Sequence, residues 1–247
     1  MSYSPQDNTS EIAEGAPVLE FDQVTLESTW PYDTAPERVS LAVRPGELVL
    51  VTLEAGHVRS PFADLTQGLI DPHGGAVRFL GWSWTEMSST TTARSRGRIG
   101  RVFDVGGWVS NLDVDENVLL AQQHHRSMPA DALPRRAEAL ARSFGLDGLL
   151  ARRPAVASQH ELRVSQWVRA LVGEPALLVL ERPTRDVRPE SVTPFLAALA
   201  TARAGGAAVL WVTTDGAAVG ARHNVAPPDV TARFAMRGRT LVPDAIR

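Results

Sequence analysis

The sequence contains no cysteine, which excludes disulfide bonds and cysteine-ligated zinc sites and fits a reducing cytoplasm. It also lacks an apolar run long enough to cross a membrane. The segment from Met1 to Gly15 is polar and acidic, without the hydrophobic stretch of a signal peptide, and residues 1–17 are expected to form a disordered tail. The formal net charge of −3 gives no indication of a nucleic-acid partner.

The 247 residues, of which 44% are hydrophobic, are enough to bury the core of one large α/β domain. The stretch from Asp104 to Ala157 is predicted to be helical. Apolar or alternating runs predict strands at residues 18–26, 39–43, 48–53, 76–80, 176–180 and 207–212, and a hairpin over 233–242.

Two helices have recognisable starts and core faces. One is predicted to begin near Ser60 and Pro61, because serine is a good N-cap and proline a good first helical residue. Its core face is predicted to carry Phe62, Leu65 and Leu69. Pro134 is predicted to open a second helix. The core face of that helix is expected to contain Ala137, Leu140, Ala141 and Phe144.

The stretch from Val168 to Thr184 is the most informative in the chain. Residues 176–180 form a short continuous apolar run, which is typical of a strand buried on both faces. Glu181 and Arg182 follow at its carboxyl end, and Pro183 closes the strand. Ligands of open α/β sheets bind at that edge, so these two charged residues are candidates for a functional site.

This stretch resembles the Walker B segment of the ATPases of ATP-binding-cassette (ABC) transporters. In that family the apolar strand ends in Asp-Glu, followed by Pro-Thr; the Asp helps to hold Mg²⁺ and the Glu positions and polarises the attacking water. Here the two positions are Glu181 and Arg182. A guanidinium has only donors and stays protonated, so Arg182 cannot accept a proton from water.

Residues 53–60 occupy the position of the P-loop in this resemblance. A working P-loop has two glycines and a lysine, because backbone N–H groups wrap the phosphates and the lysine reaches them. Hydrophobic residues replace both glycines here, Arg59 replaces the lysine, and only Ser60 matches. Two interpretations stay open: a residual anion site at Gly56, Arg59 and Ser60, or an ordinary strand–helix turn whose dipole is satisfied by its own acidic side chains.

The stretch 98–104 resembles the strand that leads to the family's Q-loop, with Asp104 in the place of the glutamine. The next stretch, 106–118, resembles the ATPases of MCE-associated lipid transport systems. In the family this surface docks the coupling helix of the permease. The resemblance therefore implies a docking surface, which would contain Trp108, Val109, Asn111 and Leu112. Alternatively, Trp108 and Val109 pack beneath the helical subdomain.

Residues 157–161 stand where the family has its signature, Leu-Ser-Gly-Gly-Gln. The glycines let a helix N-terminus press against the partner's γ-phosphate. Ser158 is retained, but Gln159 and His160 place bulk at the glycine positions. Arg188 stands in the place of the D-loop aspartate, so this chain departs from the family on both sides of the composite site.

The remaining positions are equally altered. Thr214 replaces the switch histidine that contacts the γ-phosphate in the family. Trp30 lies at a suitable distance upstream of the P-loop to stack on adenine, or alternatively packs in a surface loop. The histidines have no metal-ligand spacing, and the adjacent His124 and His125 are expected to point in diverging directions on a helix.

The resemblance implies an α/β, P-loop NTPase-like ABC ATPase fold with an N-terminal antiparallel β subdomain and an inserted helical subdomain. Residues 18–247 would form one domain, with a core of 18–103 and 158–247 and a helical subdomain of about 104–157. It implies ATP and Mg²⁺ as cofactors, with binding weakened or lost. It also implies an integral-membrane permease and a second ABC ATPase, in a homodimer or heterodimer, as partners, and a cytoplasmic position on the inner face of the plasma membrane.

Three functions stay open. The loss of several catalytic groups together favours a pseudo-ATPase with a structural or regulatory role in a membrane transport complex, with lipid as a candidate cargo. The alternative is an atypical active ATPase, in which Glu181 assists Mg²⁺, Arg59 holds phosphate and a partner subunit supplies the missing groups. A third is a free-standing binding protein that has reused the fold.

Overall fold

Two β-sheets and a layer of helices make up the computed structural model, which describes residues 16–27, 31–54, 59–125, 128–129, 131–214 and 228–244. The larger sheet has six strands in the order β10-β9-β3-β8-β7-β6, all parallel except β10. These strands are β3 (Leu48–Thr52), β6 (Ile99–Val102), β7 (Leu177–Glu181), β8 (Ala208–Thr213), β9 (Ala232–Arg237) and β10 (Thr240–Pro243).

The smaller sheet is antiparallel and has four strands in the order β2-β1-β4-β5. They are β1 (Leu19–Thr25), β2 (Val39–Val43), β4 (Gly74–Phe79) and β5 (Trp82–Ser83). The helical elements are α1 (Phe62–Thr66), α2 (Ser89–Arg96), α3 (Val114–His125), α4 (Ala132–Ser143), α5 (Gln159–Leu171) and α6 (Pro189–Ala204), with short 3₁₀ turns η1 (Trp84–Glu86) and η2 (Pro154–Val156).

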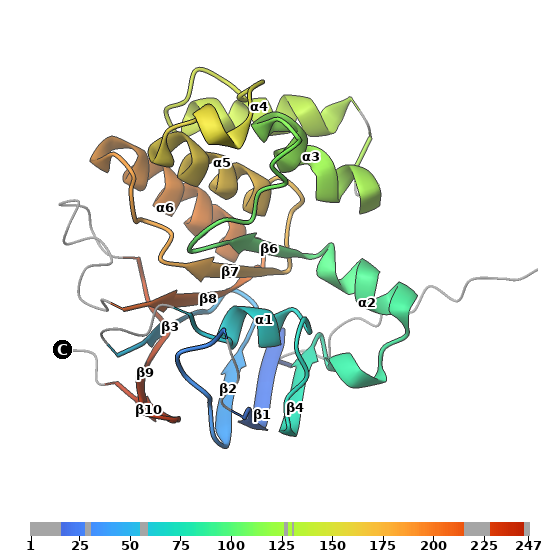
Figure 1. The fold of residues 1–247 in the computed structure, drawn as a ribbon, viewed down its shortest axis with the longest axis vertical. Helices are drawn as coiled ribbons and strands as arrows, with labels where there is room; N and C mark the ends of the chain where they lie inside the picture. The colour runs from blue at the N-terminus through green and yellow to red at the C-terminus, as the bar shows by residue number, and fades with distance from the viewer. Residues whose placement is uncertain are drawn as a thin grey trace, which may run out of the picture.

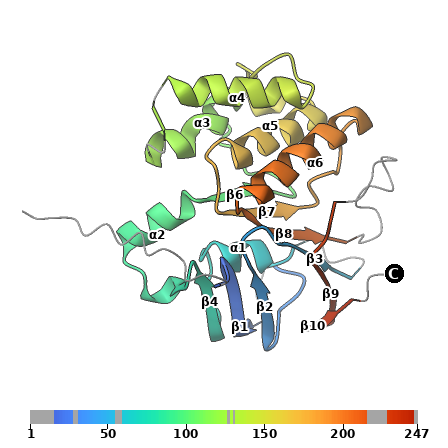
Figure 2. The same cartoon turned by 180° about the vertical axis from the view of Figure 1, so that it is seen from behind.

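The six-stranded sheet lies between two hydrophobic cores. Helices α3 to α6 cover one face, and α1 and the four-stranded sheet lie on the other (Figures 1 and 2). Strand β3 sends Val49 and Val51 into the core with α1 and sends Leu48 and Leu50 into the core with the helices. This burial on both faces explains why the central strands are continuously apolar rather than alternating.

The predicted strands and the C-terminal hairpin are all present, with ends shifted by a residue or two. The first predicted helix is shorter than expected: α1 ends at Thr66, and Leu69 is 51% exposed instead of facing the core. The chain turns away at Gly68, which has a φ of +60° and packs against the Trp84 ring. That turn removes Leu69 from the core face on which the sequence pattern places it.

Two other helix predictions need correction. The N-cap of α1 is Pro61, and the Ser60 hydroxyl accepts the N–H of Phe62 instead of capping the second or third helical residue. The stretch predicted to be helical from Asp104 is non-helical until α3 begins at residue 114, and α4 begins two residues before Pro134.

Helix α2 was not predicted, because its sequence is polar all round and none of its residues is buried. Among the described residues, no helix is both long and apolar enough to cross a membrane.

Candidate functional site

The candidate site lies at the carboxyl ends of β3, β6, β7 and β8, the edge of a parallel sheet where polar side chains gather. The structure brings five of the predicted residues around one small cavity of about 10 Å³: Ser60, Asp104, Glu181, Arg182 and Thr214. A cavity of that size holds about one water molecule. The side chains of these residues therefore lie close together at the strand ends.

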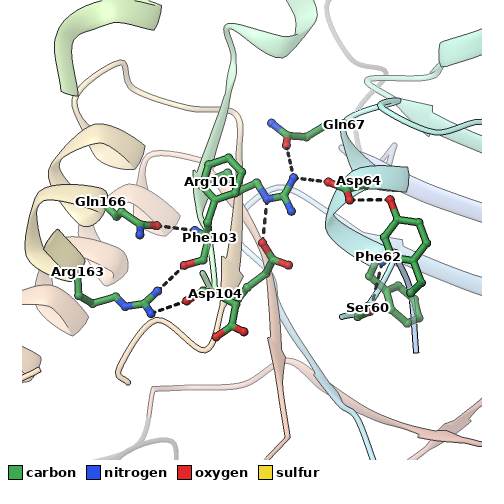
Figure 3. A network of polar contacts seen from close by, with 11 residues as sticks. Ser60, Phe62, Asp64, Gln67, Arg101, Phe103, Asp104, Arg163 and Gln166 are labelled. Carbon is green, nitrogen blue, oxygen red and sulfur yellow. Dashed lines mark hydrogen bonds and ion pairs between the residues drawn. The ribbon is translucent and has the colours of Figure 1, made fainter. Parts of the chain in front are cut away.

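Arg101 on β6 dominates this edge, although no motif pointed to it. Its guanidinium makes an ion pair with Glu181 at 2.8 Å and another with Asp64 of α1 at 2.6 Å, and it donates to the Gln67 side chain at 2.9 Å (Figure 3). The Arg101 side chain is only 8% exposed. Burial raises the pKa of Glu181, and the charge of Arg101 opposes that rise.

Asp64 also connects this pair to the loop before β2. The Tyr32 hydroxyl donates to Asp64 at 2.8 Å, and burial together with that carboxylate raises the pKa of Tyr32 to about 12. The next residue, Asp33, accepts the backbone N–H of Arg59 at 2.9 Å and donates its own N–H to the Arg59 carbonyl. The backbone beside the P-loop position is thereby fixed by the chain's own groups.

Arg182 and Asp104 form a second ion pair beside the first. The Arg182 guanidinium lies against the Asp104 carboxylate, and Arg185 contacts the other carboxylate oxygen at 3.0 Å. Arg182 adopts a φ of +43°, a left-handed conformation that costs energy for a residue other than glycine. Arg182 and Asp104 are thus of opposite charge and bind each other.

Helix α5 fixes the segment that carries Asp104. The Gln166 side chain accepts the N–H of Phe103 at 2.6 Å, and the Arg163 guanidinium donates to the carbonyls of Phe103 and Asp104 (Figure 3). Both α5 residues are buried. The sequence patterns did not indicate either of them. The available signal was that α5 leads into a buried strand, because a polar side chain buried on such a helix needs a hydrogen-bond partner.

The N-terminus of α5 carries its own anion. Ser158 is the N-cap and accepts the N–H of Glu161, while the Glu161 carboxylate accepts the N–H of Ser158 at 2.8 Å, which completes a capping box. These hydrogen bonds from Ser158 lower the pKa of Glu161. Gln159 is the first residue of the helix, and His160 accepts the N–H of Arg188 through Nδ1 at 3.3 Å.

A groove of about 610 Å³ lies between α2, β6 and α3, and it begins at the predicted docking segment. Asn117, which is buried, orders that segment: it accepts the N–H of Val109 at 2.8 Å and donates to carbonyls that include Val109 and Leu112. Trp108 packs partly buried against the helical core, and Val109 is 44% exposed on the rim. Asn111 accepts a hydrogen bond from Arg153.

Two predicted residues, Trp30 and Gly56, lie outside the described residues. Within the described ranges, no group of three histidine or acidic residues is arranged to hold a metal ion. The rings of His124 and His125 do not diverge as predicted; their centroids are 5.1 Å apart in an edge-to-face contact at the last turn of α3. The packing of two consecutive rings at a helix end overrides the spread expected inside a regular helix.

No protein-family model matches the chain. Over 161 residues it is 30% identical to the thiamine import ATP-binding protein ThiQ of Shigella boydii serotype 4, covering 65% of this chain and 67% of that protein. The same values hold for ThiQ of Escherichia coli O157:H7.

Two solved structures have a similar fold. An ATP-binding subunit of an ABC transporter matches with a TM-score of 0.75 at 21% identity, over 91% of this chain and 88% of the other. A dimeric post-hydrolysis state of the ATP-binding cassette MJ0796, bound to ADP and Pi, matches with a TM-score of 0.76 at 19% identity, over 90% and 96% of the two chains.

Proposed function

The chain belongs to the family of ABC transporter ATP-binding subunits, and we propose that it is a member that does not hydrolyse ATP and serves as a structural or regulatory subunit of a membrane transport complex. Its α/β fold, with an antiparallel β subdomain and a helical part, is that of the solved cassettes. The proposal concerns what the altered site does within that fold.

Among the described residues, the catalytic position offers no base that could activate water. Arg182 occupies the catalytic position, and it carries only donors. Its guanidinium is already held by Asp104, which is itself also bound by Arg185. Turning Arg182 away would break a pair in which the Asp104 side chain is only 11% exposed. Among the described residues at this strand end, Asp104 and Glu181 are both paired with arginines, so neither carboxylate is free to polarise a nucleophile.

The residues do not fit a magnesium ion. Mg²⁺ is bound through carboxylates, waters and substrate phosphates in near-octahedral geometry. The carboxylate at the Walker B position, Glu181, is instead paired with Arg101 at 2.8 Å, in a side chain that is 14% exposed. A fixed guanidinium at that distance repels a divalent cation. The cavity that Glu181 and Arg182 line has a volume of only about 10 Å³.

The other half of the composite site is altered as well. In the family the signature helix offers its N-terminus to the partner's γ-phosphate. Here Glu161 already occupies the N-terminus of α5 through its hydrogen bonds with Ser158. A second anion at this helix end would meet a fixed negative charge. The chain is therefore proposed to be inert as a homodimer and to support a competent partner poorly.

The loop that we propose as the docking surface is ordered by hydrogen bonds within the chain. Asn117 holds the loop around Val109 and Leu112 with several hydrogen bonds, and the loop borders the groove of about 610 Å³. We assign this groove to the membrane subunit, which would keep the chain on the cytoplasmic face of the membrane. The lipid cargo rests on the resemblance of residues 106–118, whereas the relatives that match are thiamine import proteins.

The pairing of Arg101 with Glu181 and of Arg182 with Asp104 carries the proposal. Calorimetry of the purified chain with ATP and Mg²⁺ should detect no binding at millimolar nucleotide, and a phosphate-release assay with the membrane subunit present should show no turnover. Co-purification with that membrane subunit should succeed. The comparison variant is Arg182→Glu with Asp104→Gln, which places the family's residues at these two positions without touching the groove.

Turnover by the wild-type chain that disappears in Ser60→Ala would refute the proposal and favour the atypical ATPase. Failure to bind any membrane subunit, with turnover also absent, would favour the free-standing binding protein instead.

A further inference from the structure

Helix α2 is a cationic surface that the described part of the chain does not neutralise. It has no acidic residue, and none of its residues is buried. Arg94 and Arg96 lie in its last turn, and Arg98 follows. None of these three arginines forms an ion pair with a described carboxylate. A helix that is polar all round normally depends on many charge pairs, so an anionic partner would stabilise α2.

The groove of about 610 Å³ between α2, β6 and α3 continues this charge. Arg96 and Arg169 line it, and none of its described lining residues is aspartate or glutamate. Both arginines donate to backbone carbonyls, which hold the guanidinium groups without neutralising them. Arg101 also lines the groove but is already paired with carboxylates. The cationic groove, as we name this surface of positive potential, consists of Arg94, Arg96, Arg98 and Arg169.

The start of the chain carries the opposite charge. Residues 1–15 lie outside the described residues, and their sequence contains Asp7, Glu11 and Glu14 but no lysine, arginine or histidine. The formal net charge of the whole chain is −3, so acidic and basic side chains balance over the remaining residues. The net negative charge of this protein is therefore concentrated in its first 15 residues, and the cationic groove is a complementary surface.

Apolar side chains match as well. Ile12 lies in the sequence between Glu11 and Glu14. On the groove, Val109 is 44% exposed on the loop before α3, and Leu120 is 46% exposed on α3 itself. Exposed apolar side chains rimmed by polar ones are typical of protein-interaction surfaces. A segment with an apolar side chain between two acidic ones fits a groove whose apolar rim adjoins arginines.

A series of contacts leads from the first described strand to the cationic groove. Leu19 of β1 pairs with Phe79 of β4, which lies on the α2 side of β1 (Figures 1 and 2). The Phe79 and Trp84 rings stack with centroids 5.7 Å apart, and the Arg96 guanidinium lies 5.9 Å from the Trp84 ring centroid. An extended segment of 15 residues spans up to about 50 Å, which is much longer than this series of neighbouring contacts. Residues 1–15 can therefore reach the groove of their own chain.

We propose that the acidic segment of residues 1–15 binds the cationic groove of the same chain. Its carboxylates lie against the arginines of α2, and Ile12 covers Val109 and Leu120. Covalent attachment keeps the segment at an effective concentration of about a millimolar, so ion pairs that are weak individually are sufficient. The inference stands without the proposed function. Where a membrane subunit uses the same groove, the segment competes with it and regulates its access.

The test traps the contact as a disulfide in the full chain. Because the sequence has no cysteine, an introduced pair reports only the contact under test. Ser10→Cys is combined with Leu120→Cys on the groove, or with the control Ala200→Cys, which is exposed on α6 and outside the groove. Non-reducing electrophoresis at low protein concentration follows the formation of the intramolecular bond. We expect it to form about tenfold faster with Leu120→Cys than with Ala200→Cys.

Neutralising the segment tests the role of charge. Asp7→Asn, Glu11→Gln and Glu14→Gln together keep the side-chain sizes and remove the three negative charges. They should slow trapping at Leu120 to the rate at Ala200, which should itself stay unchanged. Raising the salt concentration to about 0.5 M should have the same effect, because it screens exposed charges.

Variants of α2 locate the partner charges. Arg94→Gln with Arg98→Gln should slow trapping at Leu120 about threefold to tenfold, as for the loss of two surface ion pairs. The matched control is Arg135→Gln with Arg142→Gln, which removes two charges from α4, at positions 73% and 65% exposed and outside the groove. It should leave the rate unchanged. The neutralised segment alters no described residue, so it remains decisive if an α2 variant misfolds.

Equal trapping at Leu120 and Ala200 would overturn this inference. So would trapping at Leu120 that persists with the neutralised segment, or that responds equally to the α2 and α4 variants. None of these results bears on the proposed function, which is tested by nucleotide binding and by co-purification with the membrane subunit. Failure of that co-purification, with charge-dependent trapping intact, would remove the membrane partner and keep the contact between the segment and the groove.

Discussion

Replacing Arg101 with methionine removes one cation and leaves two carboxylates facing each other inside the site. Methionine keeps much of the side-chain volume on β6, so the change is mainly one of charge. Glu181 and Asp64 are 14% and 25% exposed, and each loses its arginine partner. We expect the variant to fold but to be strongly destabilised at neutral pH.

The magnitude follows from the burial of the pair. Removing one partner of a buried ion pair costs about 3–5 kcal/mol, because the remaining charge is left uncompensated. For a domain of this size each kcal/mol lowers the melting temperature by about 2–4 °C, so a loss of about 10 °C is expected. Adding Glu181→Gln removes the stranded charge, so the double variant should regain most of the lost stability.

The loss should depend on pH in a stated direction. Burial raises the pKa of Glu181 and Arg101 opposes this, so the variant should have a still higher pKa for Glu181. A carboxyl group whose folded pKa lies above its unfolded pKa binds the proton more tightly when folded. The variant should therefore lose stability as pH rises between those two values, and regain it as pH falls toward about 4.3, the ordinary pKa of glutamate.

Urea unfolding followed by circular dichroism, at several pH values, measures both effects. The control is Arg135→Met, because Arg135 forms a surface pair with Asp131 and is 73% exposed. Its cost should stay below about 1 kcal/mol. An Arg101→Met variant within about 0.5 kcal/mol of the wild type, or one whose stability does not change with pH, would refute the idea that Arg101 holds the two carboxylates.

Three further changes test neighbouring parts of the site by the same unfolding assay. Asp104→Asn removes the anion that lies between Arg182 and Arg185, and it should lower the free energy of unfolding by about 1–3 kcal/mol. An unchanged free energy of unfolding would mean that Arg182 and Asp104 do not form an ion pair. Ser158→Ala removes the N-cap of α5 and should cost about 1 kcal/mol. In the wild type, the stability from the lowered pKa of Glu161 should be present above its unfolded pKa and fade as pH falls, and this dependence should shrink in Ser158→Ala. Gly100→Ala should cost at least about 1–3 kcal/mol, because its Cβ would lie 2.0 Å from a backbone carbonyl of α5; an unchanged midpoint would contradict that close approach.

Much of the fold could be predicted from hydrophobic patterns alone. The runs at β3, β7 and β8 read as doubly buried strands because both faces of the sheet are covered, and the structure confirms it. Helix α2 was missed because it buries nothing and has no apolar period to detect. The end of α1 was misplaced because a turn at Gly68, held by the Trp84 ring, depends on a contact distant in sequence.

The site was harder to predict, since its partners come from separate elements. The motif positions indicated Glu181, Arg182 and Asp104 individually, but single positions do not show which charges face each other. Arg101 was not predicted at all. In the sequence, an arginine on a strand cannot be told apart from an exposed surface cation, even when its side chain points to the sheet edge. Only the register of β6 beside β7 places Arg101 next to Val179, near the end of the strand that carries Glu181.

The two ion pairs have a joint consequence for how the subunit works. In the family, the carboxylate at the end of the strand that corresponds to β7 helps to hold Mg²⁺. Here Arg101 and Arg182 neutralise Glu181 and Asp104 permanently, from within the chain. Under the proposed function these carboxylates need no cation from outside the chain, so Mg²⁺ gains no favourable partner at this strand end. Its shape should therefore stay constant through the transport cycle, and melting curves with and without Mg²⁺-ATP should superimpose; a midpoint that rises with nucleotide concentration would show that the arginines yield to a ligand.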